Sequence, residues 1–375
     1  TGPVAVREKT HDTENNRVGL VSYVNNNNTT SAIGAWFRGN MEFRSNGSSV
    51  IALNELPLEE YLYGVVGREI SPTWPIESQK AQAVAARTYA VHNYSKRLLE
   101  GFNLLATIGD QAYGGVKSEG ADVIKAVSET NGEVILYDGK PIGAFYHSTS
   151  GGHTENNENV WTSGAPIPYL RGKPDPYSTE DGLSKWSYTT TLEDVRNKLL
   201  QNSVMIGPIR ELLLEKFPSG RVRNVIITDI SGNTITKPGD EFGKLFNPGF
   251  STYKNNGSFM SRFFEINKDQ ISTPGFWVLD GSGQLKYVEG TLLRGVADDG
   301  STAQINGTSA EIFIQDALGI GFRSKAPTGS IAFIGQGWGH GVGMSQWGAY
   351  QMARQGKTYK DILSFYYSGV EVRNY

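Results

Sequence analysis

Hydrophobic and polar residues alternate over residues 34–54, and a period of two is typical of strands that turn one face toward a core. Asn46-Gly47 interrupts this alternation with a dipeptide that favours a tight hairpin turn. We therefore expect two paired strands here, joined at Asn46-Gly47.

The pattern then becomes helical. Pro57, suited to a first helical position, predicts a short helix that ends at Gly67, which would leave Glu69 just past the helix end. Pro75 predicts the start of a second helix, with Gly101 beyond its end.

The second predicted helix combines cations with many alanines. Lys80, Val84, Arg87 and Val91 are spaced so that they share one helix face, and the alanines between them allow close packing. Two cations on one face, close in sequence to Glu69, indicate one wall of a site. The alternative is a solvated basic face.

A third helix is predicted over 119–131, followed by a hairpin of 133–137 with 142–147 across Asp138-Gly139. Near the C-terminus, 344–355 has a helical pattern that stops at Gly356. Thr358 and Asp361 have the spacing of a capping box for one more helix.

Residues 190–330 have a different pattern. We expect helices over 192–200 and 209–217, and then a series of short strands: 222–228, 263–266, 277–279, 286–293 and 310–314. The predicted fold class is α+β. A helical core with β-hairpins comprises 1–190 with 331–375, and a mainly β second lobe or insertion comprises 191–330.

Composition narrows the functional classes. The 375 residues allow about two domains, and a hydrophobic content of 38% is enough for a sizeable core. A net charge of −3 gives no electrostatic basis for nucleic-acid binding. The chain has no cysteine, so it can form neither disulfides nor cysteine metal sites. It contains no apolar run of membrane-spanning length, and its first residues do not have the pattern of a signal peptide.

Glu69 is the strongest candidate for chemistry. It stands among Val65, Val66 and Ile70, and a carboxyl group in apolar surroundings keeps its proton to higher pH than one in water. A protonated carboxyl group at neutral pH can act as a general acid on a glycosidic bond. The alternative is an ordinary Glu at a helix end, paired with Arg68.

Three segments resemble one protein family. They are LPLEEYLYGVVGREI at 56–70, continued by KAQAVAARTY at 80–89; FYHSTSGGHT at 145–154 with ENVW at 158–161; and GQGWGHGVGMSQWGA at 335–349. Their composition and order resemble the stage II sporulation protein D and amidase enhancer (LytB) family. The resemblance covers most of 41–190 and 331–372, about half of the chain.

The resemblance implies a peptidoglycan lytic transglycosylase with Glu69 as its single acid/base. Such an enzyme cleaves the bond from N-acetylmuramic acid to N-acetylglucosamine and leaves 1,6-anhydro ends, because the sugar's own C6 hydroxyl replaces water. It therefore needs no second carboxylate at a fixed spacing, unlike ordinary glycosidases. The resemblance also implies export to the cell envelope, glycan strands as substrate, whether or not amidase-stripped, and a cell-wall amidase as a candidate partner.

The same resemblance implies substrate-binding roles for Lys80 and Arg87, which match the family motif at 80–89. Tyr113 is a further candidate for the glycan cleft, and the alternative for it is packing. Cations very close to Glu69 would oppose a raised pKa of its carboxyl group, so their distance from it matters.

Two polar segments supply the remaining candidates. His147, Ser148 and Ser150 lie in a Ser/Thr/Gly loop whose side chains are suited to binding sugar hydroxyls. His147 and His153, with carboxylates nearby, form only a weak zinc-binding pattern. We therefore expect no metal and no cofactor. In the glycine-rich segment 335–343 and just after it, Trp338 could stack on a sugar ring, and His340 and Gln346 could bind hydroxyls. The alternative for Trp338 and Trp347 is core packing.

A second function class stays open. A non-catalytic envelope module that binds glycan or stimulates an amidase would use the same segments without needing Glu69 as an acid.

Overall fold

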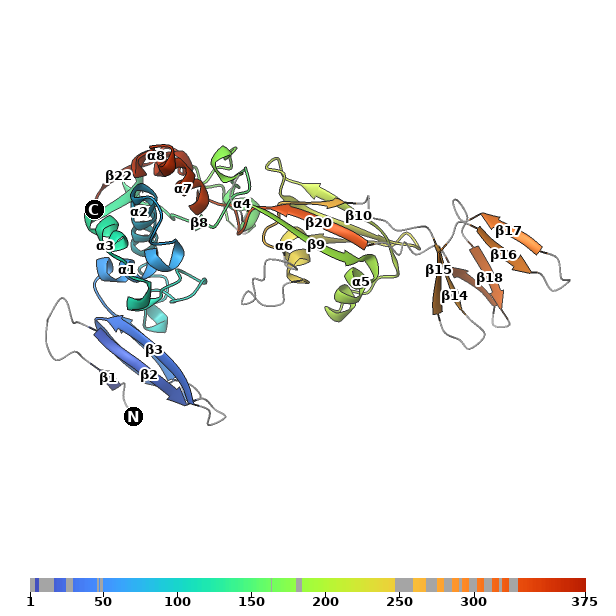
Figure 1. The fold of residues 1–375 in the computed structure, drawn as a ribbon, viewed down its shortest axis with the longest axis horizontal. Coiled ribbons are helices and arrows are strands. Elements are labelled where there is room, and N and C mark those ends of the chain that lie inside the picture. The colour runs from blue at the N-terminus through green and yellow to red at the C-terminus, as the bar shows by residue number, and fades with distance from the viewer. Residues whose placement is uncertain are drawn as a thin grey trace. The chain divides into compact units, whose positions relative to one another are not determined.

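Figure 1 shows the fold of the chain, a computed structural model. The residues it describes are 4–6, 17–24, 30–45, 47, 50–162, 164–179, 184–246, 259–267, 330–375 and six short strands between 275 and 323. They form two compact units: the first comprises 1–149, 154–179 and 341–375, and the second comprises 150–153 and 180–340. Helices and antiparallel sheets occur together, so the predicted α+β class is confirmed.

The first unit begins with strands. β2 (Arg17–Val24) pairs with β3 (Thr30–Arg38), and β1 (Val4–Val6), β4 (Asn40–Ser45) and β5 (Val50–Glu55) form a separate antiparallel sheet. β4 and β5 pair from Asn40 opposite Glu55 to Ser45 opposite Val50, which confirms that the strands on either side of Asn46-Gly47 are partners; Asn46 itself lies outside the described residues.

Helix α1 (Leu58–Glu69) runs further than predicted. Gly67 does not end it: a Cβ atom there would lie 1.8 Å from the carbonyl oxygen of Ser118, so glycine at this position allows close packing. The helix ends at Ile70, whose backbone is extended, shortly before Pro72. Glu69 is therefore the last helical residue, and α1 itself positions it.

Helix α2 (Ile76–His92) follows Pro75 as expected but stops well before Gly101. Gly101 instead follows the short 3₁₀ turn η1 (Leu98–Glu100), where its φ of 88° favours glycine. Every residue from Ala81 to Ala90 is buried, so α2 is the central helix of this unit.

The remaining elements of the first unit surround α2. They are η2 (Gly115–Ser118), α3 (Ala121–Glu129), β6 (Glu133–Tyr137), β7 (Lys140–Pro141), β8 (Tyr146–His147), α4 (Asn157–Val160), η3 (Pro176–Ser178), β21 (Met344–Ser345), α7 (Gln346–Arg354), α8 (Tyr359–Tyr366) and β22 (Glu371–Asn374). The predicted capping box of Thr358 and Asp361 is confirmed at the start of α8. The predicted return strand 142–147 is wrong in part, since β6 pairs with the short β7 while β8 pairs in parallel with β21.

The second unit is built on short antiparallel sheets. β9 (Lys185–Thr191), β20 (Ser330–Gln336) and β13 (Phe264–Asn267) form one, and β10 (Ile209–Lys216), β11 (Val222–Asp229) and β12 (Thr234–Pro238) form another. Helices α5 (Leu192–Gln201) and α6 (Gly239–Lys244) contribute to a core rich in aromatic rings, including Trp186, Phe242 and Phe333.

The helix predicted over 209–217 is wrong. The segment forms β10, in which Ile209 and Leu212 are buried and which pairs with β11 from Ile209 opposite Asp229 to Lys216 opposite Val222. Its leucines and charged residues have good helix propensity, but a neighbouring strand and a core decide the outcome.

Three two-stranded hairpins complete the second unit: β14 (Gly275–Leu279) with β15 (Leu285–Glu289), β16 (Leu292–Val296) with β17 (Thr302–Asn306), and β18 (Ile312–Asp316) with β19 (Gly319–Arg323). The single strand predicted over 286–293 is thus two strands. Of the helices that the structure describes, none is both long and apolar enough to cross a membrane.

Candidate active site

Glu69 is held where α1, α7 and the loop before η2 meet. Its side chain is half-buried, and its neighbours Val65, Val66 and Ile70 are buried. The backbone N–H of Ala112 donates to Oε1 at 3.1 Å, and Nε2 of Gln346 donates to Oε2 at 3.2 Å. Each carboxyl oxygen therefore has one neutral donor, and the carboxyl group is fixed in place.

Burial raises the pKa of the Glu69 carboxyl group above its ordinary value. The two hydrogen bonds, from Ala112 and then Gln346, and the charge of Arg68 act in the opposite direction and lower the pKa less than burial raises it. The net result is a carboxyl group that keeps its proton to higher pH, yet has donors ready for its ionised form.

Phenols and amides from three elements lie around this carboxyl group. Gln111 Nε2 donates to Tyr146 Oη at 3.0 Å and to the Ala86 carbonyl at 3.2 Å, and Tyr61 Oη donates to Gln111 Oε1 at 3.3 Å. Burial, with smaller contributions from negative charges that include Glu69, raises the pKa of Tyr61 and of Tyr146. Both phenols therefore stay protonated at neutral pH.

Sequence reasoning selected Glu69 and Gln346 and missed the residues that connect them to the rest of the site. Gln346 Nε2 also lies 3.4 Å from Oε1 of Gln82, on α2. Gln82 stands inside the motif segment 80–89, near the selected Lys80, and Gln111 stands two residues before the selected Tyr113. They are neutral residues, and nothing in their type or spacing singles them out.

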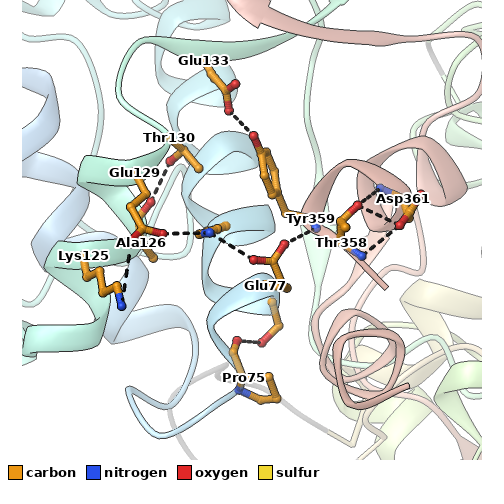
Figure 2. A network of polar contacts seen from close by, with 12 residues as sticks. Pro75, Glu77, Lys125, Ala126, Glu129, Thr130, Glu133, Thr358, Tyr359 and Asp361 are labelled. Carbon is orange, nitrogen blue, oxygen red and sulfur yellow. Dashed lines mark hydrogen bonds and ion pairs between the residues drawn. The ribbon is translucent and has the colours of Figure 1, made fainter. Parts of the chain in front are cut away.

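Lys80 belongs to a polar network between helices. Its Nζ lies 2.8 Å from Glu129 of α3 and 3.0 Å from Glu77 of α2. Glu77 accepts from the backbone N–H of Tyr359, and the hydroxyl of Tyr359 donates to Glu133, as Figure 2 shows. These contacts join α2, α3, α8 and β6.

Arg87 is buried, with 1% of its surface exposed. Its guanidinium makes a two-pronged contact with Glu59 at 2.7 and 2.6 Å and donates to the carbonyls of Val127 and Glu133. Arg87 thus ties α1, α3 and β6 to α2.

Helix geometry places these two cations away from the Glu69 side of α2. At about 100° per residue, Lys80 and Arg87 point the same way, and Gln82 points about 140–160° from them. Gln82 is the α2 side chain that shares a donor with Glu69. The substrate-binding roles of Lys80 and Arg87 stay predictions, and the contacts above give both residues a role in holding the fold.

Tyr113 packs against α1. Its ring centroid lies 5.2 Å from that of Tyr61, its hydroxyl donates to Asn54, and a Cβ atom at Gly64 would lie 2.4 Å from its ring. The preceding residue, Ala112, is the one that contacts Glu69. A contact of Tyr113 with substrate stays a prediction.

The predicted polar loop is divided between the units. In the first unit, His147 is buried with Nδ1 3.2 Å from the Val342 carbonyl, and the Ser148 carbonyl accepts from the backbone N–H of Trp347. In the second, Arg221 donates to the carbonyls of Ser150 and His153. Within the described part of the chain, no group of three or more His, Cys, Asp or Glu side chains could hold a metal ion.

Trp338 and His340 also belong to the second unit, and both are half-buried. Their segment is held by backbone hydrogen bonds from Gly337 to Ser184 and from Gly339 to Met260. The contacts predicted between these two side chains and a glycan stay predictions.

Three aromatic rings form a cluster beside Gln346. Trp347 lies 4.8 Å from Trp74 and 5.3 Å from Tyr350, and Trp74 lies 5.0 Å from Tyr350, between ring centroids. All three residues are half-buried, so parts of the rings remain accessible. We call Trp74, Trp347 and Tyr350 the aromatic cluster.

Comparison with known proteins assigns the chain to a protein family. Residues 46–137 match the family described as Stage II sporulation protein. The chain is 30% identical over 349 residues to stage II sporulation protein D of Bacillus amyloliquefaciens, covering 88% of this chain and 77% of that protein. It therefore belongs to the stage II sporulation protein D family, as the motifs predicted.

Two further relatives extend this picture. The amidase enhancer of Bacillus subtilis (strain 168) is 28% identical over 330 residues, which cover 84% of this chain but 40% of the amidase enhancer. An uncharacterized protein of Brachyspira hyodysenteriae is 29% identical over 344 residues, covering 91% of this chain and 73% of that protein.

Proposed function

We propose that this protein is a peptidoglycan lytic transglycosylase of the cell envelope, with Glu69 as its single acid/base. The observation that carries the proposal is the setting of Glu69: a half-buried carboxyl group with a raised pKa and one neutral donor on each oxygen. Membership of a family whose named relatives include sporulation and amidase-enhancer proteins supports a role at the cell wall.

The first step uses the protonated carboxyl group. Glu69 gives its proton to the oxygen that links C1 of N-acetylmuramic acid to N-acetylglucosamine, and the bond from C1 to that oxygen breaks. Positive charge develops at C1 and the ring oxygen. The Glu69 carboxylate formed in this step is stabilised by Ala112 and Gln346, which already donate to it.

The second step uses the carboxylate as a base. The C6 hydroxyl of the same sugar attacks C1 while Glu69 takes the hydroxyl proton, which closes the 1,6-anhydro ring and restores the starting carboxyl group. No water is consumed, and one carboxyl group serves both steps. A pKa near the working pH suits a group that must first lose and then regain a proton.

The aromatic cluster is the proposed contact for a sugar next to the cleaved bond. Trp347 follows Gln346 directly, and Trp74 follows Glu69 by five residues, so two of its rings are joined by short segments to the carboxyl group and its donor. We expect Trp74→Ala to weaken binding of glycan fragments about tenfold, measured by titration of tryptophan fluorescence. Unchanged binding would remove the cluster from the proposal.

The decisive experiment is digestion of purified peptidoglycan, intact and amidase-stripped, with product analysis by mass spectrometry. The wild type is expected to give anhydro-muramyl ends, and Glu69→Gln is expected to give none. Reducing muramyl ends would instead mean a hydrolase that uses water.

The printed name of the Bacillus subtilis relative, amidase enhancer, favours one second candidate: a module that stimulates a cell-wall amidase without cleaving glycan. The two candidates differ in their dependence on Glu69. Stimulation of an amidase that survives Glu69→Gln, with no glycan products from the wild type, would support the module.

A further inference from the structure

Gln82 is a buried amide with an unusual hydrogen-bond pattern. It is 1% exposed, and its Oε1 lies 3.4 Å from Gln346 Nε2, which also donates to Glu69 at 3.2 Å. Its own Nε2 is buried and has no hydrogen-bond partner among the described residues. Both distances are at the long end of the usual range, so one substitution could change the arrangement.

The direction of the Gln346 amide matters to Glu69. An ionised carboxylate only accepts hydrogen bonds, so it requires the NH₂ group of Gln346. A protonated carboxyl group could donate to the carbonyl oxygen of Gln346 instead, if that amide turned around. Its proton would then be held by Gln346 and would be less available for a substrate oxygen.

The Gln82 oxygen favours only one of these two directions. As an acceptor it bonds to the NH₂ group of Gln346 and gains nothing from the Gln346 carbonyl oxygen. While Gln346 presents its NH₂ group to the Glu69 carboxylate, turning Gln82 around would place two NH₂ groups against each other. The unpartnered Nε2 of Gln82 is thus a consequence of presenting its oxygen to Gln346. A buried donor without a partner is costly, which suggests that this amide serves the site more than the stability of the fold.

We propose that Gln82 is a positioning residue for Glu69: by accepting from Gln346, it keeps the Gln346 amide nitrogen turned toward the Glu69 carboxyl group. The inference rests on the proposed function, in which Glu69 must deliver and regain a proton. Gln82 acts through Gln346 in this proposal and need not touch the substrate.

Other titratable groups near Glu69 do not duplicate this effect. Arg68 on α1 acts on Glu69 by its charge, and Tyr61 on α1 and Tyr146 on β8 both respond to the charge of Glu69. Tyr89 of α2 acts on both tyrosines, and Asp110, in the loop before Gln111, acts on Tyr61. None of them is the acceptor that orients Gln346.

The test is the pH dependence of glycan cleavage by Gln82→Met, which keeps the length of the side chain and removes its acceptor. Without the Gln82 acceptor, the hydrogen bond from Gln346 to the Glu69 carboxylate weakens. The carboxylate is then less stable relative to the protonated carboxyl group, so the pKa of Glu69 rises. Because the acid must be protonated, activity is lost above this pKa. We therefore expect the alkaline limb of the profile to move upward by about one pH unit.

Three further variants separate positioning from a general structural effect. Gln79→Met removes another buried amide of α2, one that donates to the carbonyls of Pro72 and Trp74, and should lower stability without moving the limb. Gln346→Met should move the limb upward, and Gln82→Met combined with it should add nothing. If Gln82→Met does not fold, Gln82→Asn takes its place. Its shorter side chain withdraws the amide from Gln346 and should give a smaller upward shift of the limb.

A limb that stays in place in both Gln82 variants, or shifts of Gln82 and Gln346 that add in the double variant, would overturn the proposal. Direct titration of the Glu69 carboxyl carbon by NMR gives the same information without turnover. If the wild type cleaves no glycan, the proposed function fails. The NMR titration then still decides whether Gln82 controls Glu69, since an unshifted pKa in Gln82→Met would overturn the positioning role.

Discussion

The two sides of helix α2 carry different kinds of polar side chain. Lys80 and Arg87 lie on one side, each bound to carboxylates from the same or neighbouring helices. Gln82 lies on the other side, in a chain of neutral amides that ends at Glu69. A cation against Glu69 would hold its pKa low, whereas neutral donors support the carboxylate and leave the effect of burial dominant. On α2, Lys80 and Arg87 thus pair with carboxylates, whereas Gln82 connects through Gln346 to the candidate acid.

The largest expected effect comes from changing Glu69, on the side of α2 that carries Gln82; we call this the amide side and the side with Lys80 and Arg87 the charged side. Glu69→Gln should reduce formation of anhydro products by about a thousandfold or more, because no carboxyl group remains to move the proton. The measurement is product formation from peptidoglycan, with circular dichroism as a control for folding. Retained activity would remove Glu69 from the mechanism.

The same variant tests the raised pKa of Glu69 through stability. A pKa that is higher in the folded than in the unfolded chain means that folding favours the protonated form, so this stability is present at low pH and is lost as pH rises through the folded pKa. Glu69→Gln should abolish this loss in urea unfolding between mildly acidic and neutral pH. A pH dependence identical to that of the wild type would contradict the raised pKa.

On the charged side, Arg87→Met should destabilise the fold by about 3 kcal/mol, since it leaves Glu59 and the carbonyls of Val127 and Glu133 without their donor. Urea unfolding measures the effect. The pH profile of the remaining activity should match that of the wild type. A displaced profile would mean that Arg87 acts on Glu69 after all.

Placing a cation on the amide side should reverse the sign of the Gln82 effect. In Gln346→Lys, an ammonium group near Glu69 favours its carboxylate and lowers its pKa, so the alkaline limb should move downward and activity at neutral pH should fall about 10- to 100-fold. Gln346→Met, which moves the limb upward, is the matched control. Equal shifts in one direction for both variants would refute the electrostatic explanation.

The smallest effect belongs to Lys80. Its contacts with Glu77 and Glu129 are partly exposed, and such pairs contribute about 0.5–1 kcal/mol. Lys80→Met should lower stability by about this amount, measured by thermal unfolding, and should leave glycan binding unchanged. A marked loss of glycan binding would support the substrate-binding role predicted from the sequence.

The sequence singled out Glu69, its apolar neighbours and Gln346 as candidates, but not the other polar residues that connect them. Helical periodicity placed Lys80 and Arg87 on one face, yet periodicity cannot tell which face turns toward a residue on another helix. Gly67 resembled a helix end because glycine commonly ends helices, whereas here its missing side chain admits the Ser118 carbonyl. Gln82, Gln111 and Ala112 carry no chemical signature, so only their positions in space reveal them.

In the second unit, the contrast between 192–200 and 209–217 shows the same limit. Thr191 caps the first helix by accepting from the backbone N–H of Asp194, a local interaction that sequence can predict. The second segment has a helical composition, but it pairs with β11, and that pairing depends on residues elsewhere in the chain.

The bond between Glu69 and Gln346 joins residues 277 positions apart. During synthesis, a ribosome that has completed α1, α2 and β8 must still make the whole second unit before Gln346 emerges. A nascent chain therefore carries the candidate acid without its side-chain donor until the last part of translation. We expect the Glu69 carboxyl group to reach its final pKa only after the C-terminal helices have been released from the ribosome.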